Sequence, residues 1–225
     1  MGTIVNALGI IAGSLVGLLL KKGLPERFSK AIMTGIGLCV AYIGIDGCLE
    51  GKNALIAIIS IVVGGIIGEL IDLDKRINNL GNWLQDRFKN ENEQTSIAQG
   101  FVTASLLFCV GAMAIVGSLQ SGLSGNNEML YTKTILDTVA AVVFASSLGF
   151  GVIFSSVLVL IYQGGITLLA QYISPYLNET VISEMTCVGS LLIIALSLNI
   201  LKITNIKVMN YVPAIFLPIV LCMFM

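Results

Sequence analysis

Four carboxylates lie inside otherwise apolar stretches of this sequence, at Asp46, Glu69, Asp137 and Glu184. An acid at the centre of a bilayer costs roughly 2.5–3.5 kcal/mol, so such a residue marks a functional site by default. All four lie near the ends of their stretches, where water solvates a carboxylate more readily. We expect Asp46, Asp137 and Glu184 to form a cation-attracting vestibule on the outer side. Glu69 would mark the inner exit, and ordinary interfacial solvation is the alternative explanation for all four.

Two pairs of glycines suggest a second chemistry, based on the backbone. Gly64–Gly65 and Gly164–Gly165 lie a few residues past the middle of two apolar runs. Adjacent glycines can unwind a helix, and the freed amides and carbonyls are tolerated at membrane depth only where they line protein or water. Two such breaks would form a midplane site for an ion or small solute, with Gln163 and Asn6 as neutral polar lining. Close helix packing is the alternative.

Enzymatic chemistry is not expected. The sequence has no histidine and contains no GxSxG, HExxH or P-loop motif. The five cysteines have no CxxC spacing, and most lie in apolar runs, so they are expected to be buried thiols rather than metal ligands. They are Cys39, Cys48, Cys109, Cys187 and Cys222. We expect no catalytic residue, no metal site and no cofactor.

The composition assigns these residues to a membrane. Of 225 residues, 56 % are hydrophobic and only 11 % are charged, and the mean hydropathy is +0.94. A globular domain carries about 25 % charged residues. The lipid bilayer is therefore an expected partner, and a net charge of −1 gives no case for nucleic acid. No cleavable signal peptide is evident, because no charged segment precedes the first apolar run.

The apolar runs predict an all-α polytopic membrane protein with about eight transmembrane helices, since each span needs roughly 20 residues. The predicted spans are 2–20, 30–49, 53–71, 96–118, 132–149, 151–172, 181–201 and 209–225. The charge-free run 138–178 is too long for one helix, so we place a tight turn within 146–151; a single span here would give seven. Residues 119–130 are predicted to be a loop. The last span is short and need not cross fully.

Positive charge fixes the predicted orientation. With both termini outside, ten of the twelve basic residues fall in inner segments, and only Lys52 and Lys133 fall outside. Between the third and fourth spans, residues 72–95 carry apolar side chains at helical spacing, including Trp83, the chain's only tryptophan. This pattern predicts an amphipathic helix at the inner interface. A gating or partner-docking helix is the alternative.

Glycine-containing motifs recur in the same order in two parts of the chain. Gly13-Ser14-Leu15 corresponds to Gly117-Ser118-Leu119, and the pair Gly64–Gly65 to Gly164–Gly165. We therefore predict a 3+3 inverted repeat, the pattern of many secondary transporters. The predicted divisions are repeat 1 (1–71), the interfacial helix (72–95), repeat 2 (96–172) and a C-terminal two-helix segment (173–225).

A third glycine pattern predicts helix packing. Gly9, Gly13 and Gly17 lie four residues apart on one face of the first span, so another backbone can approach closely. The same face would also serve a homo-oligomer.

Four stretches carry a resemblance to a known family. They are Gly2–Gly9 followed by Lys21–Pro25, Gly64–Glu69, Phe108–Gln120 and Tyr162–Gly165. Together they resemble the bacterial YdfK/YqgA-type membrane proteins, a family of unknown function, over nearly the whole chain. The resemblance implies a polytopic protein of the cytoplasmic (inner) membrane and supplies no mechanism. It draws attention to polar residues within these runs, namely Asn6, Glu69, Gln120 and Gln163.

Taken together, the residues favour a transporter or channel for a cation or small polar solute. No ATP-binding motif is present, so transport would be secondary or passive. A non-transporting scaffold, sensor or partner subunit remains the alternative, supported by the glycine face of the first span and the amphipathic segment.

Overall fold

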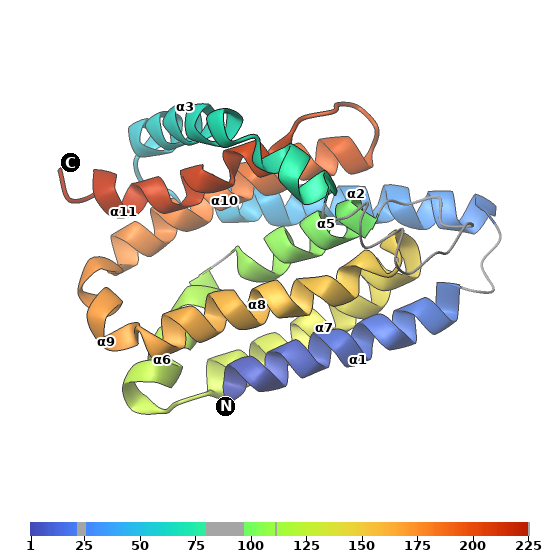
Figure 1. Ribbon diagram of the computed structural model, residues 1–225, viewed down its shortest axis with the longest axis horizontal. Coiled ribbons are helices and arrows are strands. Elements are labelled where there is room, and N and C mark those ends of the chain that lie inside the picture. Colours follow the sequence, from blue (N-terminus) through green and yellow to red (C-terminus); the bar gives the residue numbers. More distant parts are fainter. Residues whose placement is uncertain (22–25, 80–96, 111, 225) are drawn as a thin grey trace. The chain divides into compact units, whose positions relative to one another are not determined.

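The computed structural model describes residues 1–21, 26–79, 97–110 and 112–224, and all regular structure in them is helical (Figure 1). The helices are α1 (Gly2–Lys21), α2 (Glu26–Cys48), α3 (Ala54–Ile71), α5 (Ile97–Cys109), α6 (Ala112–Ser124), α7 (Glu128–Leu148), α8 (Gly151–Leu168), α9 (Ala170–Ile173), α10 (Glu179–Ile200) and α11 (Leu217–Leu221), with 3-10 helices η1 (Ser174–Tyr176) and η2 (Val208–Phe216). The prediction of an all-α polytopic membrane protein is confirmed.

Five helices of the described residues are long and apolar enough to cross a membrane: α1, α3, α7, α8 and α10. A sixth span arises if α5 and α6 are counted together, although they are bent by 61° at their junction. Residues 33–48 of α2 and residues 208–221 form shorter apolar helices. The predicted fourth span is therefore broken, and the predicted eighth is largely a 3-10 helix.

Two connections were predicted with different success. The turn between α7 and α8 falls at Gly149, whose φ of 79° favours glycine, as the charge-free run indicated. The predicted loop 119–130 is wrong, because α6 continues to Ser124 and α7 begins at Glu128. Residues 73–79 are helical, whereas the rest of the predicted amphipathic segment, with Trp83, lies outside the described residues.

The chain divides into two compact units that interleave along the sequence. Unit 1 comprises residues 1–32, 77–109 and 113–172, and unit 2 comprises residues 33–76, 110–112 and 173–225. Neither coincides with the predicted divisions 1–71 and 96–172, so the inverted repeat stays a prediction.

In unit 1, α1 packs against α7 and α8, and α5 packs against α8. Gly9, Gly13 and Gly17 all face α7, where a Cβ on Gly13 would collide with the carbonyl oxygen of Thr138. From Gly9 to Gly17, the residues of α1 contact successively later residues of α7, so the two helices run parallel. Helix α8 is antiparallel to them, because Thr3 lies by Thr167 and Asn6 by Gln163. In lipid, such close backbone approach supplies contact energy that apolar side chains alone do not.

In unit 2, glycines again allow close approach. Gly64 and Gly68 on α3 lie against the backbone of η2 at Ala214 and Asn210. On α2, Gly37, Gly44 and Gly47 lie against α10. The irregular η2 backbone is thereby covered by α3, as non-helical backbone at membrane depth requires.

The α1–α7 contact makes a testable prediction. Gly13→Ala should lower the free energy of unfolding by about 1–3 kcal/mol, because the new Cβ overpacks against Thr138. The control is Gly35→Ala, where a Cβ would meet nothing within 4 Å, so the variant should be neutral or more stable by up to about 1 kcal/mol. Thermal unfolding of the purified protein in detergent measures both. Equal effects would contradict the assigned packing.

Candidate functional site

Unit 1 contains a cluster of four buried polar side chains contributed by three helices. Asn6 comes from α1, Lys133 and Asp137 from α7, and Gln163 from α8. Asn6 and Gln163 are fully buried, and Lys133 and Asp137 are 6 % and 5 % exposed. We call these four residues the polar cluster.

Hydrogen bonds link all four residues. The side-chain nitrogen of Asn6 donates to Oδ2 of Asp137 at 2.9 Å and to Oε1 of Gln163 at 3.2 Å. Lys133 and Asp137 are four residues apart on α7 and therefore lie on one face. Their ion pair, with Nζ 2.8 Å from Oδ1, brings opposite charges together inside the unit.

Asp137 lies deeper than the sequence indicated. Because α7 begins at Glu128, four residues before the predicted start, Asp137 is the tenth of its 21 residues. The sequence predicts that this carboxylate is a vestibule acid near the outer end of its helix. It is instead buried near the middle of its helix, where Lys133 and Asn6 compensate its charge.

Two atoms of the cluster remain without a partner among the described residues. They are the side-chain oxygen of Asn6, an acceptor, and the side-chain nitrogen of Gln163, a donor. Leaving a buried polar group unsatisfied costs about 1–3 kcal/mol. The cluster therefore offers one free acceptor and one free donor on neighbouring amides.

Hydroxyl groups extend from the cluster towards the N-terminus of α1. Thr3 and Thr167, one turn from Asn6 and Gln163, have their hydroxyl oxygens 3.4 Å apart, within hydrogen-bond distance. The hydroxyl of Thr167 also donates to the carbonyl oxygen of Ser118 on α6 at 3.2 Å. At the end of this row, the backbone amide of Gly2 donates to Oδ1 of Asn127.

The break in the predicted fourth span follows Cys109, the last residue of α5. Within unit 1, α5 packs against α7, the helix that carries Lys133 and Asp137. Discontinuous helices that border buried polar groups are typical of the substrate sites of secondary transporters. Here the break is at the α5–α6 junction and not at the glycine pairs.

Both glycine pairs lie within continuous helices, so the expectation of unwound backbone there is wrong. Gly64 and Gly65 face η2, where a Cβ would meet Ala214 and Tyr211. The packing alternative therefore explains this pair. A Cβ at Gly164 or Gly165 would meet nothing within 4 Å, so close packing does not explain the second pair.

The acids of unit 2 lie at helix ends. Glu184 is fully buried, and its Oε1 accepts hydrogen bonds from the backbone amides of Lys52 and Asn53 at 2.8 and 2.9 Å, at the start of α3. This carboxylate thus anchors the positive end of a helix dipole. Glu69 is exposed and lies 3.5 Å from the ammonium of Lys207, and Asp46 is exposed.

Of the residues selected from the sequence, the structure brings together Asn6, Asp137 and Gln163. Gln120 is half-buried on α6, where its backbone carbonyl accepts a hydrogen bond from the hydroxyl of Ser124. Sequence reasoning missed Lys133 by assigning it to an outer segment. The i,i+4 spacing of Lys133 and Asp137 within an apolar helix was the available signal. No group of three or more potential metal-ligating residues occurs in the described part of the chain.

Comparison with known proteins identifies the family. The model of the family described as "Protein of unknown function (DUF554)" matches residues 1–223. The chain belongs to this family. It is 34 % identical over 221 residues to "Uncharacterized membrane protein YdfK" of Bacillus subtilis, covering 96 % of this chain and 93 % of that protein. It is 30 % identical over 220 residues to "Uncharacterized protein YqgA" of Escherichia coli, covering 96 % and 94 %. The resemblance found in the sequence is thereby confirmed, and no solved structure matches.

The ion pair of this DUF554 protein makes a second prediction. Lys133→Met or Asp137→Leu alone should lower the free energy of unfolding by about 3–5 kcal/mol, because each leaves an uncompensated buried charge. The double variant should recover much of that loss, since neither charge remains. Unfolding by sodium dodecyl sulfate in mixed micelles measures the cycle, with exposed Lys75→Met as the control. Additive single effects would contradict a coupled pair.

Proposed function

We propose that this protein is a membrane transporter or channel for an ion or small polar solute, working without ATP hydrolysis and without enzymatic chemistry. The site is the polar cluster of unit 1. Asn6 and Gln163 contact the solute, while Lys133 and Asp137 hold their amides in place and neutralise each other.

The buried ion pair is the observation that carries the proposal. Lys133 and Asp137 lie inside an apolar helix that is long enough to cross a bilayer, and both are at least nine-tenths buried. Ionisable residues in such helices are expensive and typically mark substrate or ion pathways. The span that is bent by 61° supports the same assignment, because α5, its first half, packs in unit 1 against α7, which carries the ion pair.

A transport assay can distinguish the effect of the polar cluster from that of the acids outside it. Proteoliposomes would be tested by stopped-flow light scattering under osmotic gradients of KCl, NaCl, glycerol and acetamide. Asp137→Asn should slow the transported probe about tenfold or more, because it removes a charged partner of Lys133 and Asn6. Glu69→Gln should keep the parent rate, since Glu69 is exposed in unit 2.

Two results would contradict this proposal. Equal slowing by both substitutions would show that the polar cluster matters no more for transport than Glu69 does. If no probe moves faster than in protein-free liposomes, a non-transporting scaffold or partner subunit becomes the better explanation.

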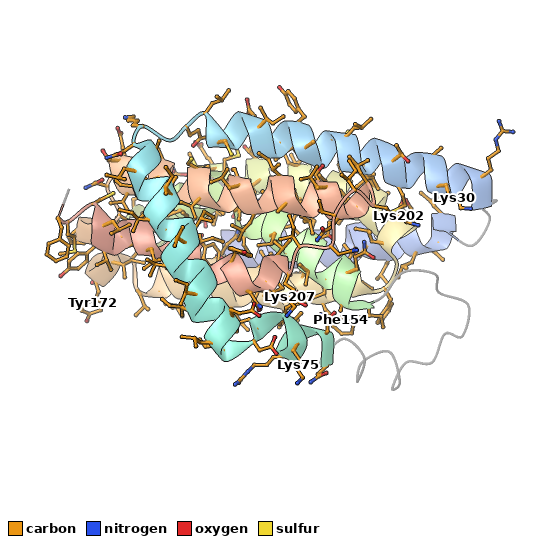
Figure 2. The ribbon with its side chains drawn as sticks, turned by 90° about the horizontal axis from the view of Figure 1, so that it is seen from above. Lys30, Lys75, Phe154, Tyr172, Lys202 and Lys207 are labelled. Carbon is orange, nitrogen blue, oxygen red and sulfur yellow. The ribbon has the colours of Figure 1, made fainter. Side chains whose placement is uncertain are left out.

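We also propose an orientation in the bacterial inner membrane with both termini outside. Support comes from unit 2, where Lys207 lies by Glu69 at the C-terminal end of α3, near Lys75 (Figure 2), whereas Lys52 lies at its start. In unit 1, Lys133 belongs to the interior of α7 and not to a loop, so the outer segments carry even less positive charge than the sequence indicated.

Cysteine labelling tests this orientation. In a background with the native cysteines replaced, Lys52→Cys should react with a membrane-impermeant maleimide in intact cells. Lys75→Cys should react only after permeabilisation. The reverse pattern would invert the topology. Both side chains are exposed, so accessibility reports the side of the membrane.

A further inference from the structure

We propose that the polar cluster binds a small uncharged solute that carries a hydrogen-bond donor and an acceptor side by side, the chemistry of a primary amide or an alcohol. This inference rests on the proposed function and names its substrate class. Charge balance, the two free hydrogen-bonding atoms and the hydroxyl row beside them carry the argument.

The charge balance disfavours ions of either sign. The side chains of Lys133 and Asp137 are each 8 % exposed and pair at 2.8 Å, so the cluster has no net charge. A cation would approach the ammonium of Lys133, and an anion would approach the carboxylate of Asp137. In a buried site such like-charge contacts are screened little by salt.

The supply of oxygen ligands also argues against a dehydrated cation, since a hard cation such as Ca²⁺ takes six to eight oxygens. Both carboxylate oxygens of Asp137 and the side-chain oxygen of Gln163 already accept hydrogen bonds. Within the cluster, only the side-chain oxygen of Asn6 has no partner among the described residues.

The free atoms match a neutral dipolar group. Oδ1 of Asn6 requires a donor, and Nε2 of Gln163 requires an acceptor. The two amides are already joined through Nδ2 and Oε1 at 3.2 Å, so these free atoms lie on adjacent groups. A primary amide presents an N–H donor and a carbonyl acceptor on one planar group, and a hydroxyl presents both on one atom.

The surroundings of the cluster have the same neutral character. Thr3 and Thr167 lie one turn from Asn6 and Gln163 on the same faces of α1 and α8, and the only polar group of each side chain is an uncharged hydroxyl. A purely structural cross-link among three helices would gain nothing from two unsatisfied buried atoms, because each costs stability. The row of amides and hydroxyls instead provides donors and acceptors for an uncharged solute along its path.

The test uses three probes of nearly the same shape that differ in charge: acetamide (neutral), acetamidinium (positive) and acetate (negative). Ethylene glycol, the fourth probe, tests whether the cluster binds an alcohol as well as a primary amide. Saturation-transfer NMR with the full-length protein in lipid nanodiscs detects weak binding without requiring transport. We expect saturation transfer to acetamide or ethylene glycol and none above empty nanodiscs for the two ions.

Two variants of Gln163 locate the binding. Gln163→Met keeps the length of the side chain and removes its donor, so acetamide should bind about tenfold more weakly. The matched control is Gln120→Met on α6, which should bind like the parent. If Gln163→Met does not fold, Gln163→Glu serves instead. Its added negative charge should shift the preference from acetamide to acetamidinium.

Each outcome decides a different point. Undiminished acetamide binding in the folded Gln163 variants, or stronger binding of acetate or acetamidinium by the parent, would overturn the inference. Flux of KCl or NaCl without binding of either neutral probe would also overturn it while leaving the proposed transport function intact. Binding that follows Gln163, without flux of any probe, would support the site and overturn the transport function.

Discussion

The side-chain nitrogen of Asn6 makes the contact on which unit 1 depends, because one amide joins α1 to both α7 and α8. Apolar helix faces gain little from meeting in lipid, so polar contacts and close backbone approach decide which helices associate. Asn6 supplies the first, and Gly9, Gly13 and Gly17 further along α1 supply the second. The register that brings the glycines onto the α7 backbone also brings Asn6 to Asp137. Packing and the candidate site therefore follow from one arrangement.

Unit 2 compensates a buried carboxylate in a different way, with backbone amides instead of an ion pair. Oε1 of Glu184 accepts hydrogen bonds from the backbone amides of Lys52 and Asn53, just before α3, so its charge lies at the positive end of that helix. Asp137 lies in mid-helix, where no free backbone amide is available, and it needs Lys133 and Asn6 instead. The hydrogen bonds at the start of α3 compensate the charge of Glu184 and explain why this carboxylate is buried. Both arrangements leave buried atoms without a partner among the described residues: Oε2 of Glu184 in unit 2, and the side-chain oxygen of Asn6 and the side-chain nitrogen of Gln163 in unit 1.

The sequence predicted most helices and their turns because hydropathy and charge are local properties. The 138–178 run predicted a turn within 146–151, which the structure places at Gly149, and α10 begins within two residues of its predicted start. The glycine pairs were misinterpreted because unwinding and packing both require a missing Cβ. For Gly64–Gly65, only η2, about 140 residues beyond α3, distinguishes the two. Asn6 and Gln163 were selected as polar residues in apolar runs, but the hydrogen bonds that join Asn6 to Gln163 and to Asp137 depend on tertiary structure that local patterns do not contain.

The distribution of the polar cluster over its helices also bears on movement. Lys133 and Asp137 share α7, so their ion pair travels with that helix as one body. Asn6 and Gln163 come from α1 and α8, and each contact between helices is a hydrogen bond rather than a separated pair of charges. A displacement of α1 relative to α7 would break the hydrogen bond from Asn6 to the Asp137 carboxylate, worth about 1.5–3 kcal/mol, without separating the two charges. An ion pair divided between two moving helices would make the same displacement far more costly. Confining both charges to one helix would therefore keep the buried site neutral during the helix movements that the proposed transport function requires.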